Sequence, residues 1–151
     1  MKKSIPVLIV LCGLLLSGCA KSSQPAVYTG PPLNDVEFAK KVFEFLADGD
    51  ETVKGMLDWE HLKMLGIDVG ALYTKTSGDA ARDKETSDFI RSYSNSFKQR
   101  GGSVGNFSNW REQSRDATNT VVVADVPTGQ HISMTVTHIN GQQKVSTMEI
   151  K

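Results

Sequence analysis

The sequence predicts an α+β fold in which three N-terminal helices pack on a curved, four-stranded antiparallel sheet. The prediction depends on a change in the spacing of apolar residues along the chain. They recur every three or four positions between residues 33 and 100, as on amphipathic helices, and every second position from Ser103 onward, as in strands. A sheet with one apolar face needs a cover, and the helices are the elements that can supply it.

The first helix is expected to begin at Leu33-Asn34. Asn34 is a good N-cap residue, and Glu37 stands three positions later, which is the spacing of a capping box. Leu33 and Phe38 have the spacing of a hydrophobic staple, which fixes the direction in which the chain enters a helix. Gly49 is expected to end this helix, because glycine adopts the left-handed conformation of a C-cap at little cost.

Two more helices are expected before the sheet. The second runs from about Glu51 to Leu65, and a loop with a short strand or turn near Leu72-Tyr73 follows it. The third spans about Ala80 to Arg100 and ends at a pair of glycines. Aromatic residues recur on it at every fourth position: Phe89, Tyr93 and Phe97.

The remainder of the chain is expected to form a meander of four strands. Their approximate ranges are 104–113, 119–126, 130–139 and 142–150. Asn140-Gly141 joins the last pair and is the strongest short-range signal for a hairpin. Along the third strand the residues that share one face are Ile132, Met134, Val136 and His138.

Residues 1–18 have the layout of a secretory signal peptide. Lys2 and Lys3 precede an almost wholly apolar stretch from Ile5 to Leu16, which is too short for the roughly 20 apolar residues of a spanning helix. Leu16-Ser17-Gly18-Cys19 resembles the lipobox of bacterial lipoproteins. This resemblance implies cleavage before Cys19 and attachment of diacylglycerol to its thiol through a thioether.

The chain is therefore divided into a signal peptide at 1–18, a lipidated Cys19 with a flexible tether at 19–32, and one α+β domain at 33–151. Two or more acyl chains anchor a protein stably in a bilayer. In a host with two membranes, Ala20 after the cysteine implies a lipoprotein of the outer membrane that faces the periplasm.

The composition of the mature chain excludes several functional classes. Removal of residues 1–18 takes away Cys12, Lys2 and Lys3, so 15 basic residues face 17 acidic residues and Cys19 is the last cysteine. The net charge of −2 gives no electrostatic basis for binding nucleic acid. With Cys19 acylated, no thiol is left for a disulfide, a nucleophile or a metal ligand, and we expect no metal or cofactor.

The order of elements resembles the nuclear transport factor two-like fold, a cone-shaped, cystatin-like α+β fold. The residues that carry the resemblance are "FAKKVFEFLADGDETVKGMLDWEHL", the aromatic helix from Phe89 to Phe97, and "HISMTVTHINGQQKVSTMEI". It covers residues 33–151 and is similar in particular to a lumazine-binding-like group of bacterial lipoproteins of unknown function. Enzymes with this fold place an acid or a base inside the cone, whereas many other members have no known chemistry.

The candidate catalytic residues are Asp58, His61 and His138. His61 lies four residues from Leu57 and from Leu65, so a helix would place it on the apolar stripe. A histidine in the cone beside a carboxylate can serve as a general acid or base. A buried structural histidine and a histidine at the rim of the sheet are the corresponding non-catalytic interpretations.

A second set of residues is suited either to a ligand cavity or to a packed core. Its members are the aromatic and sulfur-containing residues Trp59, Tyr93, Phe97, Trp110 and Met134. The leading hypothesis is a non-enzymatic binding or scaffolding lipoprotein for an envelope protein or a small apolar ligand. The alternative is a small acid–base enzyme, similar to an isomerase or dehydratase, that uses a histidine inside the cone. We expect the cone to be filled by side chains.

Overall fold

The computed structural model describes residues 28–151 and confirms the α+β class. The predicted signal peptide, Cys19 and most of the tether lie outside these residues. The elements in chain order are α1 (Asp35–Asp48), the 3₁₀ helix η1 (Glu51–Met56), β1 (Lys63–Met64), β2 (Ile67–Asp68), α2 (Val69–Lys75), α3 (Asp79–Gln99), the 3₁₀ helix η2 (Val104–Asn106), β3 (Ser108–Arg115), β4 (Asn119–Asp125), β5 (His131–Ile139) and β6 (Gln142–Ile150).

The strands form one mixed sheet of six strands in the order β2-β1-β6-β5-β4-β3. The predicted antiparallel meander is present as β3 to β6, and its last turn has Asn140 and Gly141 at φ values of 50° and 76°. The prediction of a four-stranded antiparallel sheet was nevertheless wrong, because the hairpin β1–β2 extends the sheet and β1 runs parallel to β6.

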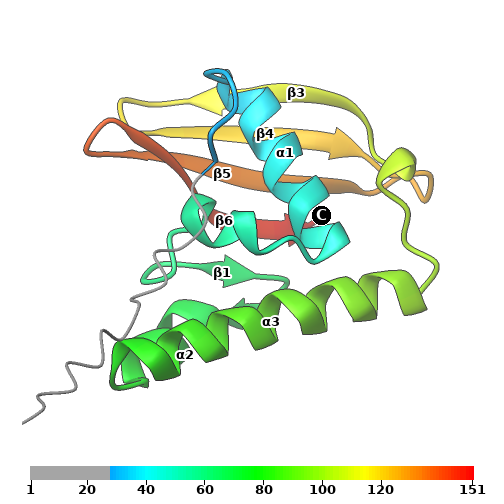
Figure 1. Cartoon of the computed structure of the whole chain (residues 1–151). Coiled ribbons are helices and arrows are strands. Elements are labelled where there is room, and N and C mark those ends of the chain that lie inside the picture. The colour runs from blue at the N-terminus through cyan, green and yellow to red at the C-terminus, as the bar shows by residue number, and fades with distance from the viewer. Residues whose placement is uncertain (1–27) are drawn as a thin grey trace, which may run out of the picture.

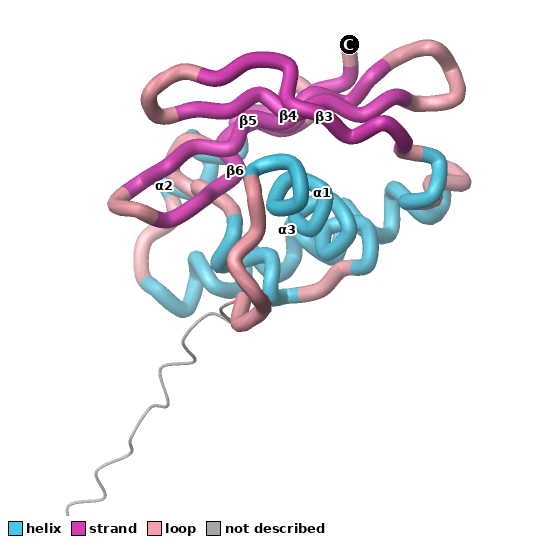
Figure 2. The backbone as a smooth tube through the Cα atoms, turned by 90° about the horizontal axis from the view of Figure 1, so that it is seen from above, coloured by secondary structure: helices cyan, strands magenta, loops and turns pink. Residues whose placement is uncertain are grey.

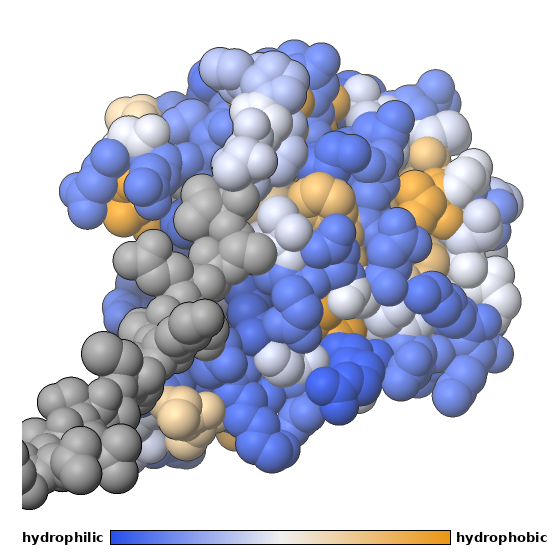
Figure 3. Space-filling view, viewed as in Figure 1, coloured by the Kyte–Doolittle hydropathy of each residue, from blue (hydrophilic) through white to orange (hydrophobic). Residues whose placement is uncertain are grey.

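Helix α1 lies across the meander, and α3 runs beneath it at a lower level (Figure 1). Seen from above, the strands form one layer and both helices lie on the same side of it (Figure 2). The core lies between the layers and includes Ile132, Met134 and Val136 of β5, which are fully or almost fully buried. The space-filling view of the helical face shows a mostly hydrophilic surface on which apolar side chains form small separate areas (Figure 3).

The predicted ends of the first helix are confirmed. The Asn34 side chain accepts a hydrogen bond from the Glu37 N–H at 2.9 Å, and the Glu37 carboxylate accepts one from the Asn34 N–H at 3.2 Å. Gly49 has a φ of 80° at the C-cap, where its N–H donates to the carbonyls of the last turn. The third predicted helix is also confirmed, with bounds one residue earlier at each end.

The prediction for residues 51–78 was wrong in two places. The expected second helix ends as a 3₁₀ helix at Met56, and β1 occupies part of its expected second half. The expected loop contains β2 and the helix α2. None of the helices described for residues 28–151 combines the length and the apolar character that a membrane-spanning helix needs.

Candidate functional site

An open groove with a volume of about 450 Å³ lies beside the loop that follows η1. Three parts of the chain form it: the loop itself, α2, and the hairpin between β5 and β6. Its lining residues are Leu57, Asp58, Trp59, Glu60, His61, Tyr73, Ile139, Asn140, Gln142 and Lys144.

The loop is held in place by β6. Leu57 forms an isolated parallel bridge with Val145, and the Asp58 N–H donates to the Val145 carbonyl at 2.9 Å. The next turn closes where the His61 N–H donates to the Asp58 carbonyl at 3.1 Å. The backbone of the sheet therefore determines where Asp58 and His61 lie.

Asp58 and His61 form a side-chain pair at the groove. The His61 Nδ1 lies 3.0 Å from Asp58 Oδ2, and the carboxylate side chain is 11% exposed whereas the imidazole side chain is 71% exposed. The expectation that His61 lies on a buried apolar stripe was therefore wrong. A carboxylate that contacts one ring nitrogen orients the imidazole and leaves the other nitrogen available to a ligand.

Lys144 reaches the same groove from β6. Its ammonium donates a hydrogen bond to the Gly55 carbonyl. Burial lowers the pKa of Lys144 below its usual value, and the nearby Asp58 carboxylate opposes this shift. Lys144 lines the groove, whereas Arg111 and Arg115 both lie on β3 and pair there with acidic residues.

His138 belongs to a different cluster. Its Nε2 lies 3.0 Å from Oδ1 of Asp35, at the first turn of α1. His61 and His138 thus contact different carboxylates, and His138 is not among the residues that line the groove. The structure does not bring these two candidate histidines together.

Asp35 is the centre of that second cluster, and its side chain is 3% exposed. Its carboxylate accepts hydrogen bonds from Thr120 at 2.6 Å and from Gln143 at 2.7 Å, and Arg115 lies 3.0 Å away. Burial raises the pKa of Asp35, but the hydrogen bonds from Thr120, Gln143 and His138 outweigh it, so the pKa is lowered overall. With partners on β3, β4, β5 and β6, Asp35 attaches the start of α1 to the whole meander.

The aromatic candidates separate into two groups. Phe97 and Trp110 both pack on the buried ring of Phe43, with centroids 5.7 Å away in each case, and Tyr93 stacks on Phe97 at 6.3 Å. Met134 is completely buried in the core. Met134 is thus part of the core, and the three aromatic residues are partly buried against it.

Trp59 is the exception among the aromatic candidates, because it lines the groove. Its indole N–H donates to the Lys54 carbonyl at 2.9 Å. The Lys54 side chain is itself fixed and is only 8% exposed. Its ammonium lies 2.6 Å from the Glu51 carboxylate and 2.8 Å from the carboxylate of Asp83 on α3. The backbone that accepts the indole hydrogen bond is therefore tied to α3 by the Lys54–Asp83 ion pair, in which the lysine side chain is buried and the carboxylate is half-exposed.

Within residues 28–151, no three histidine, cysteine, aspartate or glutamate side chains come close enough together to hold a metal ion. No protein-family model, curated protein or solved structure matches this chain. The resemblance to the nuclear transport factor two-like fold therefore stays a prediction.

Proposed function

We propose that the chain is an acylated lipoprotein of the bacterial envelope whose domain binds a segment of a partner protein in the groove beside Trp59. The anchor rests on the sequence alone, through the lipobox-like residues that end at Cys19. The domain is proposed to be a filled variant of the nuclear transport factor two-like cone. The four-stranded meander and the helix α1 across its inner face support this assignment.

The observation that carries the binding proposal is the composition of the groove. Its volume lies within the roughly 300–1,000 Å³ of small-molecule pockets, but such pockets are mostly apolar. This groove combines two aromatic residues, Trp59 and Tyr73, with the charged or titratable side chains of Asp58, Glu60, His61 and Lys144. Central aromatic anchors surrounded by polar groups are typical of a protein–protein interface, which favours a protein over a small apolar ligand.

The edge strand β3 is poorly suited to pairing with a partner strand, which also favours the groove as the binding site. The sheet has two edge strands, and β3 is the longer of them, because β2 at the other edge has only two residues. An incoming strand would find its longest partner in β3. Its pairing with β4 shifts register twice, and it carries the charged residues Arg111, Glu112 and Arg115. Bulges and charges on an edge strand oppose the addition of another strand.

The acid–base alternative has less support in this geometry. His61 is oriented by Asp58 but is largely exposed to water, and His138 lies in another cluster. A general base works best where burial and neighbours tune its pKa. The alternative predicts that His61→Ala abolishes turnover of a small substrate, whereas the binding proposal predicts loss of a partner.

Site-specific photo-crosslinking in the native cell tests the binding proposal. A photoreactive residue at Gln142, exposed at the groove, is expected to give a specific adduct with an envelope protein. The matched control is Gln113, an exposed glutamine on β3 at the far edge of the sheet. His61→Ala and Glu60→Ala, both at exposed positions, are expected to reduce the Gln142 adduct severalfold. Equal adducts at Gln142 and Gln113, or an adduct insensitive to both alanine variants, would contradict the proposal.

Cys19→Ser tests the anchor separately. The acylated chain is expected in the membrane fraction with the added mass of its acyl chains, and the variant is expected to lose that mass. Retention of the same mass by the variant would refute acylation at Cys19.

A further inference from the structure

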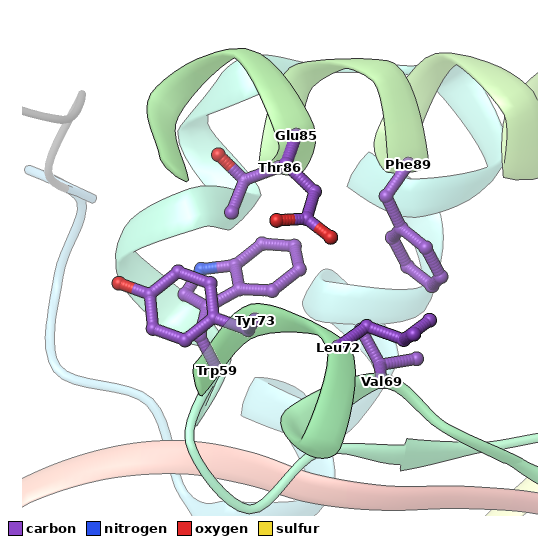
Figure 4. A pocket seen from close by; sticks show the side chains of 7 residues that line it. All are labelled: Trp59, Val69, Leu72, Tyr73, Glu85, Thr86 and Phe89. Atoms are coloured by element: carbon purple, nitrogen blue, oxygen red, sulfur yellow. The ribbon is translucent and has the colours of Figure 1, made fainter. Parts of the chain in front are cut away.

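A small cavity lies on the other side of Trp59, between α2 and α3 (Figure 4). Its volume of about 40 Å³ exceeds the roughly 10–15 Å³ that one water needs, so it has room for a group of a few non-hydrogen atoms. The lining residues are Trp59, Val69, Leu72, Tyr73, Glu85, Thr86 and Phe89.

Three aromatic rings contribute to this cavity. The centroids of Trp59 and Tyr73 are 6.1 Å apart, and those of Trp59 and Phe89 are 5.8 Å apart with planes at 88° to each other. A cation is attracted to a ring when it lies within about 6 Å of the centroid. An ion in a space lined by all three rings therefore interacts with more than one of them.

Glu85 adds a negative charge to the rings. Figure 4 shows its carboxylate pointing from α3 toward the indole of Trp59. One carboxylate oxygen accepts a hydrogen bond from the Thr76 hydroxyl at the end of α2, which holds the side chain in this orientation. The surface of the cavity itself is almost wholly apolar, so the rings contact a bound cation and the nearby carboxylate attracts it through its charge.

The rest of the lining selects the kind of cation. Val69 and Leu72 are apolar, and the Thr86 hydroxyl already donates to the Asp83 carbonyl at 2.9 Å. The apolar lining offers few acceptors to an ion with several N–H groups, and N–H groups that lose water without gaining an acceptor are costly. A quaternary ammonium group has no N–H groups and avoids this cost.

We propose that the cavity formed by Trp59, Tyr73, Phe89 and Glu85 binds a quaternary ammonium group. Such a group occurs in free solutes such as choline and in the phosphocholine headgroup of lipids. The inference does not rest on the partner groove: Trp59 and Tyr73 line both sites, but Glu85 and Phe89 line the cavity alone.

Arg82 already places a cation beside one wall of the cavity. Its guanidinium lies 5.3 Å from the centroid of the Tyr73 ring, and its Nε donates to the Thr76 carbonyl at 3.0 Å. A fixed positive charge at this position repels a cationic ligand. Its removal is therefore expected to strengthen binding.

Fluorescence titration of the full chain tests the inference. The chain is held in a maltoside detergent, which has no ammonium group, and Trp110→Phe leaves Trp59 as the sole tryptophan. Choline and tetramethylammonium, at constant ionic strength, are expected to change the Trp59 emission in a saturable way. Dimethylbutanol, the uncharged carbon isostere of choline, is expected to bind at least about tenfold more weakly, because it lacks the cation–π attraction.

Variants distinguish a cation site from a simple apolar pocket. Glu85→Gln is expected to weaken choline binding about tenfold through loss of the charge attraction. Arg82→Gln is expected to strengthen it severalfold, a gain that misfolding cannot produce. Phe107→Leu, in the separate cluster around Phe43, serves as the control and is expected to leave binding unchanged.

Equal affinity for choline and dimethylbutanol would overturn the inference, as would the absence of any saturable response to both cations. Glycerophosphocholine, the soluble form of the lipid headgroup, identifies the source of the ligand. Binding as tight as that of choline supports a lipid headgroup, whereas binding of choline without glycerophosphocholine supports a free solute. Both results support a quaternary ammonium site.

Discussion

Replacement of Asp35 by alanine is expected to lower the free energy of unfolding by about 3–5 kcal/mol, because it removes a buried carboxylate that accepts charge-assisted hydrogen bonds from Thr120 and Gln143. Asp35 is the first residue of α1, and its side chain has partners on all four strands of the meander. The substitution therefore removes the polar attachment between the helix and the sheet.

The individual contacts give a similar magnitude. Thr120 is buried, so its hydroxyl would lose its acceptor at a cost of about 1–3 kcal/mol. The bond from Gln143 is partly buried and charge-assisted, and such bonds contribute about 1.5–3 kcal/mol each. Loss of a negative charge from the first turn of a helix adds roughly 0.3–1 kcal/mol. His138 and Arg115 are half-exposed and regain water, so they add little.

Urea denaturation of the purified chain, followed by circular dichroism, measures this change. The matched control is Asp125→Ala, because Asp125 also pairs with an arginine, at 2.9 Å from Arg111, but lies at the surface. An exposed pair contributes roughly 0–1 kcal/mol, so the control is expected to change stability by less than 1 kcal/mol. A loss for Asp35→Ala as small as that of the control would refute the reasoning.

The pH dependence gives a second test of the same residue. The pKa of Asp35 is lower in the folded chain than the ordinary value of 3.8, so the unfolded chain binds a proton first as the pH falls. The stabilisation from Asp35 is fully present above the unfolded pKa and is lost as the pH falls through the folded pKa. Asp35→Asn, which cannot ionise, is expected to lose this part of the acid dependence. An unchanged acid profile in the variant would contradict the assignment.

Two further substitutions test the backbone packing beneath the groove and the burial of the Tyr93 phenol. Gly70→Ala would place a Cβ 2.4 Å from the Glu60 carbonyl oxygen. It is therefore expected to lower the free energy of unfolding by about 1–3 kcal/mol and to reduce the Gln142 adduct. Gly105→Ala is the neutral control, because the nearest atom to its Cβ would be 3.7 Å away. Burial raises the pKa of the Tyr93 phenol above 10.0, so the unfolded chain releases this proton first and stability falls as the pH rises above about 10. Tyr93→Phe is expected to flatten that fall, which urea midpoints on either side of pH 10 would measure.

The elements that could be predicted from the sequence are those specified by their own residues. Asn34 and Glu37 cap α1 through contacts three residues apart, and Asn140-Gly141 closes a turn between adjacent strands. Helix α3 needs only its own long apolar pattern. Such local signals are sufficient because the interacting residues are close in the sequence.

The error in residues 51–65 has a physical cause. Val53, Met56 and Leu57 are all buried and have helical spacing, so the first half of the segment does fit a helix. Leu62 and Met64 are buried at alternate positions, which is the pattern of a strand. Strand β1 pairs with β2 across the turn at Leu65-Gly66, but each strand has only two residues. Its other partner is β6, about 85 residues later, and no local pattern specifies such a distant partner.

The wrong expectation for His61 has the same cause, because it assumed helical spacing where the buried residues alternate as in a strand. On a helix, His61 would share a face with Leu57, but in the alternating pattern it lies on the side opposite to Leu62 and Met64 and faces solvent. Lys144 and Glu85 were missed as site residues for a different reason. The spacing of Glu85 and Phe89 on α3 does place them on one face, but Trp59 and Tyr73 reach them only through the tertiary fold.

Trp59 explains why both proposed sites are already formed without a ligand. Its indole lines the groove and the cavity, so a rotation of this one side chain would disrupt both. The hydrogen bond to the Lys54 carbonyl fixes the ring, and the ion pairs of Lys54 with Glu51 and Asp83 fix that carbonyl relative to α3. Because α3 also carries Glu85 and Phe89, the buried lysine holds the rings and the carboxylate in one arrangement. A ligand then does not have to order these side chains when it binds, which is the main energetic advantage of a preformed site.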